Sequence, residues 1–139
     1  MKTALVTGAS RGIGAACARE LARAGWAVAV NYRSSREKAE AVAAQIRQEG
    51  GVALAIPGDI GDPEQVEALF RTAETELGSV EVLVNNAGIA QQKLFTDLTE
   101  EDWDELFRVD VKGVLLCCRR ALPGMLRRHG GSIVNISSM

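Results

Sequence analysis

Three glycines follow the first apolar run of the chain in a pattern that suits phosphate binding. Gly8, Gly12 and Gly14 stand between that run and a helical pattern over residues 15–24. Glycine allows a sharp turn from strand to helix, close approach of a pyrophosphate to the backbone, and tight packing of the helix on a sheet. The first amides of such a helix face the phosphates. The sequence predicts a dinucleotide bound at this turn, which includes Ile13, and an ordinary tight turn is the alternative.

Two arginines are candidates for binding a further phosphate. Sites for a dinucleotide with a free ribose have an acid roughly 20 residues after the glycine turn, which accepts a hydrogen bond from the ribose. Tyr32 occupies that position, and Arg33 follows it. Arg11 and the hydroxyl of Ser10 lie within the glycine turn. An arginine can hold a phosphate through two charge-assisted hydrogen bonds, so the sequence favours NADP (NADPH) over NAD. Two solvated surface arginines are the alternative.

The elements that must position these residues alternate along the chain. Five short apolar runs are typical of strands covered on both faces, at residues 4–6, 27–30, 52–56, 80–84 and 132–136. Between them, apolar residues recur at three- and four-residue steps, as over residues 66–77, which is typical of helices with one buried face. Three helix starts are indicated by capping residues: Ser34 with Glu37, Asp62 with Pro63 and Gln65, and Thr99 with Asp102.

This alternation predicts the fold class. Strands that alternate with helices indicate parallel strands joined by right-handed crossovers, with helices on both faces of the sheet. We therefore expect a single α/β domain over residues 1–139, built on a doubly wound parallel sheet.

Composition excludes several function classes. The 139 residues are 47% apolar and 24% charged, as in an ordinary globular domain. Sixteen Lys and Arg against eighteen Asp and Glu give a formal net charge of −2, so we expect no nucleic acid or membrane partner. No apolar run approaches the roughly 18 residues of a membrane span, and no signal-peptide pattern follows Met1, so we expect a cytoplasmic protein. Cys17, Cys117 and Cys118 lack zinc-site spacing, and no metal is expected.

Three motifs together resemble the short-chain dehydrogenase/reductase family. They are Thr7-Gly8-x-x-x-Gly12-x-Gly14 at the first turn, Asn85-Asn86-Ala87-Gly88 after the fourth apolar run, and Asn135-Ile136-Ser137-Ser138 at the end of the fifth. Each stands at the carboxyl end of a predicted strand, and the resemblance covers essentially the whole chain. It implies a sheet of the Rossmann type with strand order 3-2-1-4-5. Within the family, the N-terminal half is most similar to the 3-oxoacyl-[acyl-carrier-protein] reductase branch.

The resemblance implies cofactor contacts beyond the glycine turn. Asp59 would accept a hydrogen bond from the adenine amino group, and Ile60 would line the adenine. Asn86, Ala87 and Gly88 would pass beside the cofactor ribose, where only small side chains fit. A loop or capping carboxylate is the alternative for Asp59, and an ordinary turn is the alternative for the Asn-Ala-Gly segment.

The resemblance also implies a reaction. Family members transfer hydride between the nicotinamide and a carbonyl or alcohol, using a serine, a tyrosine, a lysine and an asparagine. Ser138 matches the serine that orients the substrate oxygen, and Ser137 is the weaker choice. Asp110 stands where the family has the asparagine that holds a relay water, and it lacks the amide donors. A cap at a break in the helical stretch 102–128 is the alternative for Asp110.

The proton donor of the family is not among these residues. Its Tyr-x-x-x-Lys segment should follow the serine closely, but the sequence ends at Met139. Tyr32 is the only tyrosine, and it lies at the adenosine end of the predicted site. We expect the sequence to be the N-terminal part of a longer reductase, with further strands beyond Met139, and the 139-residue chain alone to be inactive.

Two function hypotheses follow. The first is an NADPH-dependent reductase of a small-molecule or carrier-bound carbonyl, such as a 3-oxoacyl group in fatty acid biosynthesis. The second is a catalytically inactive NADP-binding sensor or interaction module, which Asp110 and the missing tyrosine also suit. A Rossmann-like methyltransferase is disfavoured, because no acid follows the second strand to bind its ribose. The helix over residues 111–125 is apolar on more than one face and pairs subunits in the family, so we expect a homo-oligomer.

Overall fold

A five-stranded parallel sheet forms the centre of the molecule. The computed structural model describes residues 2–137. The strands are β1 (Thr3–Val6), β2 (Ala27–Tyr32), β3 (Val52–Pro57), β4 (Val80–Asn85) and β5 (Ser132–Asn135). Their order is β3-β2-β1-β4-β5, and every neighbouring pair is parallel. The predicted doubly wound sheet and its strand order are confirmed.

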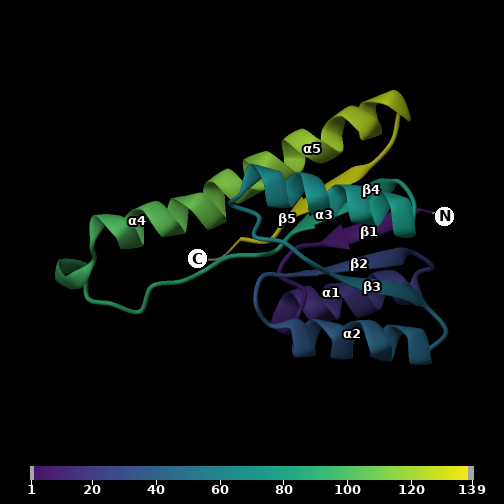
Figure 1. The fold of residues 1–139 in the computed structure, drawn as a ribbon, viewed down its shortest axis with the longest axis horizontal. Coiled ribbons are helices and arrows are strands. Elements are labelled where there is room, and N and C mark those ends of the chain that lie inside the picture. Colours follow the sequence, from purple (N-terminus) through teal and green to yellow (C-terminus); the bar gives the residue numbers. More distant parts are fainter. Residues whose placement is uncertain (1, 138–139) are drawn as a thin grey trace.

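Helices cover both faces of this sheet (Figure 1). On one face lie α1 (Gly12–Arg23) and α2 (Arg36–Gln48), and on the other α3 (Pro63–Glu76) and α5 (Gly113–Arg127). A short 3-10 turn, η1 (Phe95–Asp97), precedes α4 (Glu100–Phe107), which continues into α5 through a π-helical turn, η2 (Arg108–Lys112). No helix in the part of the chain that the structure describes is long and apolar enough to cross a membrane.

Two apolar layers hold the helices to the sheet. Alternate residues of a strand point to opposite faces, so Ala4 and Val6 of β1 pack with α1 and α2, whereas Leu5 packs with α3 and α5. Phe70 of α3 is fully buried in the second layer. Cys117 is also buried there, and burial raises the pKa of its thiol to about 12, so this cysteine serves as a small apolar side chain.

The predicted helix starts are confirmed in part. Asp62 caps α3 by accepting a hydrogen bond from the amide of Glu64 at 2.9 Å, and Thr99 forms a capping box with Asp102. Gln65 does not close a capping box, because its side-chain oxygen accepts from the amide of Asp59 instead. The prediction for α2 was wrong by one residue: Ser35 is its N-cap, without a side-chain hydrogen bond.

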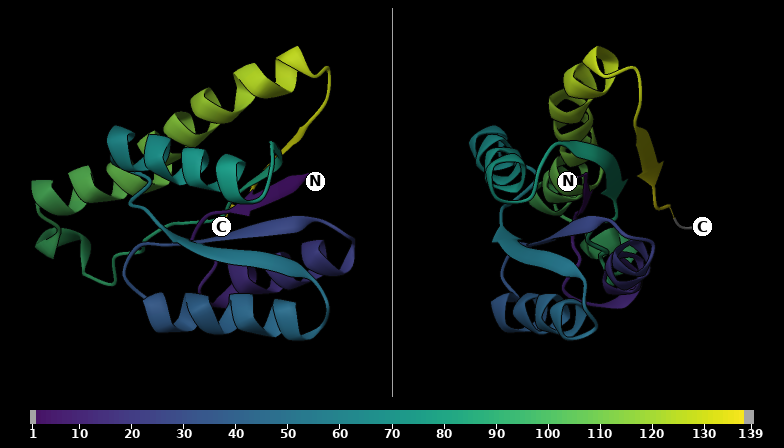
Figure 2. Two further views of the ribbon diagram at one scale, coloured as in Figure 1. Left: turned by 45° about the vertical axis from the view of Figure 1, so that its right-hand side comes forward. Right: turned by 90° about the vertical axis from the view of Figure 1, so that its right-hand side faces the viewer.

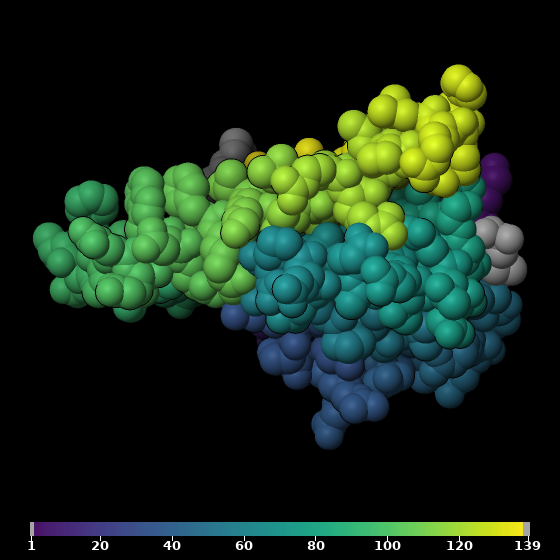
Figure 3. Space-filling view, turned by 45° about the horizontal axis from the view of Figure 1, so that its top comes forward, coloured from purple at the N-terminus to yellow at the C-terminus, as the bar shows by residue number. Residues whose placement is uncertain are grey.

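The outermost strand and one helix have little cover from the described residues. Among residues 2–137, β5 pairs with β4 alone, and Val134 is 45% exposed, as expected for an edge strand (Figure 2). Helix α4 contains no buried residue, and with the segment before it projects from the body of the protein (Figure 3). On α4, Trp103 stacks on Phe107 with ring centres 4.5 Å apart, and both side chains are exposed.

A clamp between the ends of β1 and β4 shapes the glycine turn. The buried Thr7 hydroxyl accepts hydrogen bonds from the amides of Asn86 and Ala87, both at 3.0 Å. In return, the Asn86 side-chain amide donates to the carbonyl oxygens of Thr7 and Gly8, at 3.2 and 3.0 Å. Residues almost eighty positions apart are thus held by four reciprocal hydrogen bonds. We define Thr7, Gly8, Asn86 and Ala87 as the strand-end clamp.

Two glycines are required where this clamp meets α1. Gly8 has a φ of +59°, and a β-carbon there would lie 2.8 Å from the Cα of Ala87. A β-carbon on Gly14 would lie 2.4 Å from the Asn86 side-chain nitrogen and 2.5 Å from the Gly8 carbonyl oxygen. Helix α1 can therefore pack against the strand-end clamp only because Gly14, in its first turn, has no side chain.

We expect Gly14→Ala to lower the free energy of unfolding by about 2 kcal/mol, because its methyl group overlaps hydrogen-bonded backbone that cannot move aside. Gly124→Ala in α5 is the matched control. Its β-carbon meets only the flexible end of Arg128, so this variant should stay within about 1 kcal/mol of wild type. Urea unfolding followed by circular dichroism measures both. Equal stabilities of the two variants would contradict the role of Gly14.

Candidate nucleotide-binding site

A cavity of about 460 Å³ opens at the carboxyl ends of β1, β2, β3 and β4. In an open parallel sheet, this edge is where ligands bind. The cavity is lined by Gly8, Ser10, Arg11, Asn31, Tyr32, Arg33, Ser34, Ser35, Gly58, Asp59, Ile60, Asn86, Ala87, Gly88, Ile89 and Val109. Most residues that the sequence suggested for cofactor binding therefore surround one space.

The glycine turn forms one wall of this cavity in two ways. Gly8, Ser10 and Arg11 line the space directly. Gly12 and Gly14 do not line it, but they set the path of the turn and the start of α1. Ile13 does not line it either, and its side chain is 61% exposed. For Ile13, the expected cofactor contact would therefore come from its backbone in the first turn of α1.

The start of α1 suits an anionic ligand. Gly12 has a φ of +59°, and an added β-carbon would meet no atom within 4 Å, so this side of the turn is open. The first turn of a helix leaves amide groups without intrahelical partners, and the first turn of α1 contains no acidic residue. Backbone, helix dipole and open space at Gly12 together fit a pyrophosphate group.

Asn31 is a cavity-lining residue that was not predicted from the sequence. Its side chain is buried, and its oxygen accepts from the amide of Gly8 at 3.2 Å. Its amide nitrogen donates to the carbonyl oxygens of Ile56 and Gly58, at 3.3 and 3.1 Å. Asn31 thus joins the glycine turn to the ends of β2 and β3. A polar residue within the otherwise apolar run of β2 was the available signal.

The turn after β3 places Asp59 and Ile60 on the cavity wall. One oxygen of the Asp59 carboxylate accepts from the amide of Gly61 at 3.0 Å, and the other accepts from Arg108 at 2.9 Å. Ile60 is buried, and a β-carbon on Gly113 would lie 2.4 Å from its terminal carbon. Asp59 therefore lines the cavity, as a cofactor-binding residue would, and its carboxylate also stabilises its own turn, as the capping alternative supposed.

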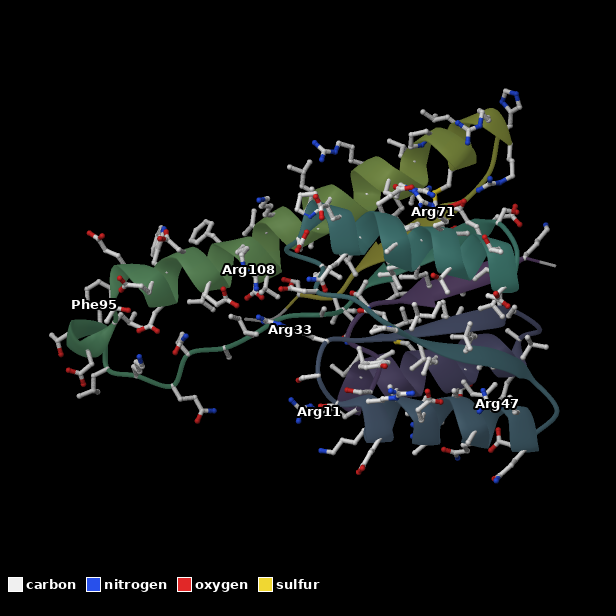
Figure 4. The ribbon with its side chains drawn as sticks, in the orientation of Figure 1. Arg11, Arg33, Arg47, Arg71, Phe95 and Arg108 are labelled. Atoms are coloured by element: carbon white, nitrogen blue, oxygen red, sulfur yellow. The ribbon has the colours of Figure 1, made fainter. Side chains whose placement is uncertain are left out.

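Four charged side chains form ion pairs beside this part of the cavity lining. Two of them, Glu105 and Arg108, were not predicted from the sequence. Arg33 lies 3.2 Å from Glu105 and 3.7 Å from Asp59. Arg108 binds Glu105 at 2.8 Å and Asp59 at 2.9 Å. We define these residues as the four-residue ion cluster; Figure 4 shows the neighbouring arginines Arg33 and Arg108. Hydrogen bonds from Arg108 above all, and from Arg33, lower the pKa of Glu105 to about 2, so its carboxylate is ionised at neutral pH.

Asp110 lies in the π-helical turn between α4 and α5. Its side chain is exposed and does not cap a helix break; one carboxylate oxygen accepts from the amide of Ile89 at 2.9 Å. That oxygen is also 3.2 Å from where a β-carbon on Gly88 would stand. Asp110 therefore holds the segment after β4 and needs no buried partner for its charge.

The predicted catalytic end is described only in part. Ser138 lies outside the described residues, and the preceding Ser137 is exposed after β5. The side-chain amide of Asn85 donates to the side-chain oxygen of Asn135 at 2.9 Å, which joins the second and third motifs across β4 and β5. Tyr32 ends β2, is 8% exposed and lines the cavity beside Arg33; its expected place at the adenosine end stays a prediction.

Solved structures with the same fold include two NADP complexes. A gluconate 5-dehydrogenase from Burkholderia cenocepacia, described in complex with NADP and tartrate, is 38% identical with a TM-score of 0.88, over 99% of this chain and 53% of that one. A metagenomic short-chain oxidoreductase in complex with NADP is 37% identical with a TM-score of 0.93, over 99% of this chain and 62% of that one.

Curated relatives match the chain along its length. The 3-oxoacyl-[acyl-carrier-protein] reductase FabG of Staphylococcus aureus (strain Mu50) is 46% identical over 138 residues, which are 99% of this chain and 56% of that protein. The 3-oxoacyl-[acyl-carrier-protein] reductase of Synechocystis is 41% identical over a similar span. The chain thus spans just over half the length of these relatives. The family model described as short chain dehydrogenase matches residues 2–139, so this chain belongs to the short-chain dehydrogenase family.

Proposed function

We propose that residues 1–139 form the nucleotide-binding domain of an NADPH-dependent carbonyl reductase. The observation that carries this proposal is the 460 Å³ cavity, which has the glycine turn on one wall and both Arg11 and Arg33 on its lining. The NADP bound in the two similar solved structures supports the choice of cofactor.

Each wall of the cavity has a separate task in this proposal. The amides at the start of α1 bind the pyrophosphate. Arg11 and Arg33 bind the 2′-phosphate of the adenosine ribose. Asp59 and Ile60 face the adenine, and the segment from Asn86 to Gly88 leaves room for the ribose. NADPH, when bound, supplies a hydride for reduction of a carbonyl carbon.

For the substrate, we propose a carrier-bound 3-oxoacyl group. The support is that relatives 41–46% identical to this chain are 3-oxoacyl-[acyl-carrier-protein] reductases. In this proposal Ser138 orients the carbonyl oxygen. Asp110 fixes the segment after β4 through the Ile89 amide, so it is a positioning residue for the cofactor wall.

Binding and turnover distinguish this proposal from an inactive NADP-binding module. The whole protein that carries residues 1–139 is titrated with NADPH and followed by nicotinamide fluorescence, and a 3-oxoacyl thioester is then added while NADPH absorbance is recorded. Binding followed by loss of absorbance supports the reductase. Binding without turnover supports the inactive module, and absence of binding contradicts both.

A second copy of the chain is the partner we propose for the long α4–η2–α5 helix. Six apolar side chains between 43% and 65% exposed follow one another along it. They are Trp103, Phe107, Val111, Leu115, Leu122 and Leu126, which we define as the apolar stripe. Leu116, on another face of the same helix, is buried against the sheet. The cytoplasmic location expected from the sequence stays a prediction.

We expect wild type to bind NADPH more tightly than NADH, and Arg33→Ala or Arg11→Ala to weaken NADPH binding about tenfold, because each loses a charge-assisted hydrogen bond. NADH affinity should hardly change. Arg71→Ala is the matched control, because Arg71 lies on the outer face of α3 and is 72% exposed. Calorimetric titration gives all the Kd values. Equal wild-type affinity for NADH and NADPH would contradict the two-arginine assignment.

We expect wild type to form a homo-oligomer and Leu115→Glu to dissociate it, because a charge would be buried in the apolar contact. Val52→Glu is the control, since Val52 is an exposed apolar residue on the opposite edge of the sheet. Light scattering measures the masses. A monomeric wild-type protein would contradict the proposed homo-oligomer.

A further inference from the structure

The four-residue ion cluster connects helix α4 to the nucleotide cavity. Arg33 and Asp59 line the cavity, whereas Glu105 and Arg108 stand behind them on α4 and in η2. Since α4 has no buried residue, its links to the cavity wall run through charged side chains. The cluster therefore joins a cofactor residue to a helix that does not line the cofactor site.

The two arginines of the cluster are held to different degrees. Arg108 approaches Glu105 with two nitrogens, at 2.8 and 2.9 Å, in the forked geometry of a strong arginine–carboxylate pair. Arg33 makes single contacts with Glu105 and Asp59, at 3.2 and 3.7 Å, and its side chain is 52% exposed. Arg33 is therefore the member that can leave the cluster, while Arg108 keeps both carboxylates satisfied.

The charges of the cluster already balance without a nucleotide. Two guanidinium groups face two carboxylates, and both terminal nitrogens of Arg33 point to a carboxylate. A phosphate dianion that binds Arg33 must compete with Glu105 for one of these terminal nitrogens. Because Glu105 does not line the cavity, it can act on a ligand only through Arg33 or through its charge.

We propose that Glu105 sets cofactor specificity by competing with the 2′-phosphate of NADPH for Arg33. The inference rests on the proposed function, that is, on NADPH binding in this cavity. Exchange of Glu105 for phosphate moves Arg33 toward the nucleotide and leaves Glu105 on Arg108. The competition lowers the preference for NADPH over NADH, and it loosens one of the links between α4 and the cavity whenever NADPH binds.

The test is Glu105→Gln, which removes the charge and keeps the shape of the side chain. NADPH should bind about threefold more tightly, in keeping with the small strength of exposed ion pairs, and NADH affinity should not change. Glu101→Gln is the matched control, since it removes one charge from the same helix at an exposed residue. Should Glu105→Gln unfold, Glu105→Asp serves instead, because a shorter side chain loosens the contact with Arg33 and must shift NADPH affinity the same way.

A double-mutant cycle with Arg33→Ala tests whether Glu105 affects NADPH affinity through Arg33. In the Arg33→Ala background, Glu105→Gln should leave NADPH affinity unchanged. An equal gain in both backgrounds would overturn the inference, because Glu105 would then act through its charge alone. Weaker NADPH binding by Glu105→Gln would also overturn it, because Glu105 would then position Arg33 for the phosphate.

Failure of the inference and failure of the proposed function give different results. If wild type prefers NADPH, Arg33→Ala reduces that preference and Glu105→Gln has no effect, the competition is wrong and the cofactor assignment stands. If wild type binds neither nucleotide, the proposed function fails and the competition with it.

Discussion

The geometry of the nucleotide site depends on one atom, the hydroxyl oxygen of Thr7. It accepts two amide hydrogen bonds from the segment after β4, and the side chain of Asn86 returns two to the turn after β1. The turn and the segment are adjacent parts of the cavity lining, so the clamp fixes their relative position. Groups that bind a pyrophosphate and a ribose must be held at a set separation, and hydrogen bonds from side chains to backbone do this better than loop contacts.

Asn31 extends the same arrangement to the other side of the cavity. Through its side chain, the glycine turn is bonded to the ends of β2 and β3, where Arg33 and Asp59 emerge. Four strand ends therefore act as one frame. The residues on that frame differ in rigidity: Asp59 is held by its own turn and by Arg108, whereas Arg33 is half exposed and loosely paired.

The sequence predicts what depends on local pattern and on strand order. Apolar runs located the five strands to within about two residues at each end, and alternation with helices implied a parallel sheet. The resemblance to the short-chain dehydrogenase family implied the strand order and placed the glycine turn and the Asn-Ala-Gly segment beside one cofactor, and both line one cavity. Contacts between distant charged residues carry no such pattern. Arg108 and Asp59 are 49 positions apart, and Arg33 and Glu105 are 72 apart, so only the folded chain brings them together. The role of Asn31 was not predicted for the same reason, since its partners come from the ends of two other strands, β1 and β3.

The four-residue ion cluster also restricts how this protein could change its cofactor during evolution. One route from a phosphorylated to an unphosphorylated nucleotide replaces Arg33, the neighbour of the usual acid position at Tyr32, with an acid that would accept from a ribose hydroxyl. In this chain that acid would become the third carboxylate around Arg108, beside Asp59 and Glu105. Its repulsion from the other two would counteract the new hydrogen bond. A lineage derived from this sequence would therefore have to lose Glu105 before an acid at position 33 became advantageous, so the order of the two mutations is set by a helix outside the binding site.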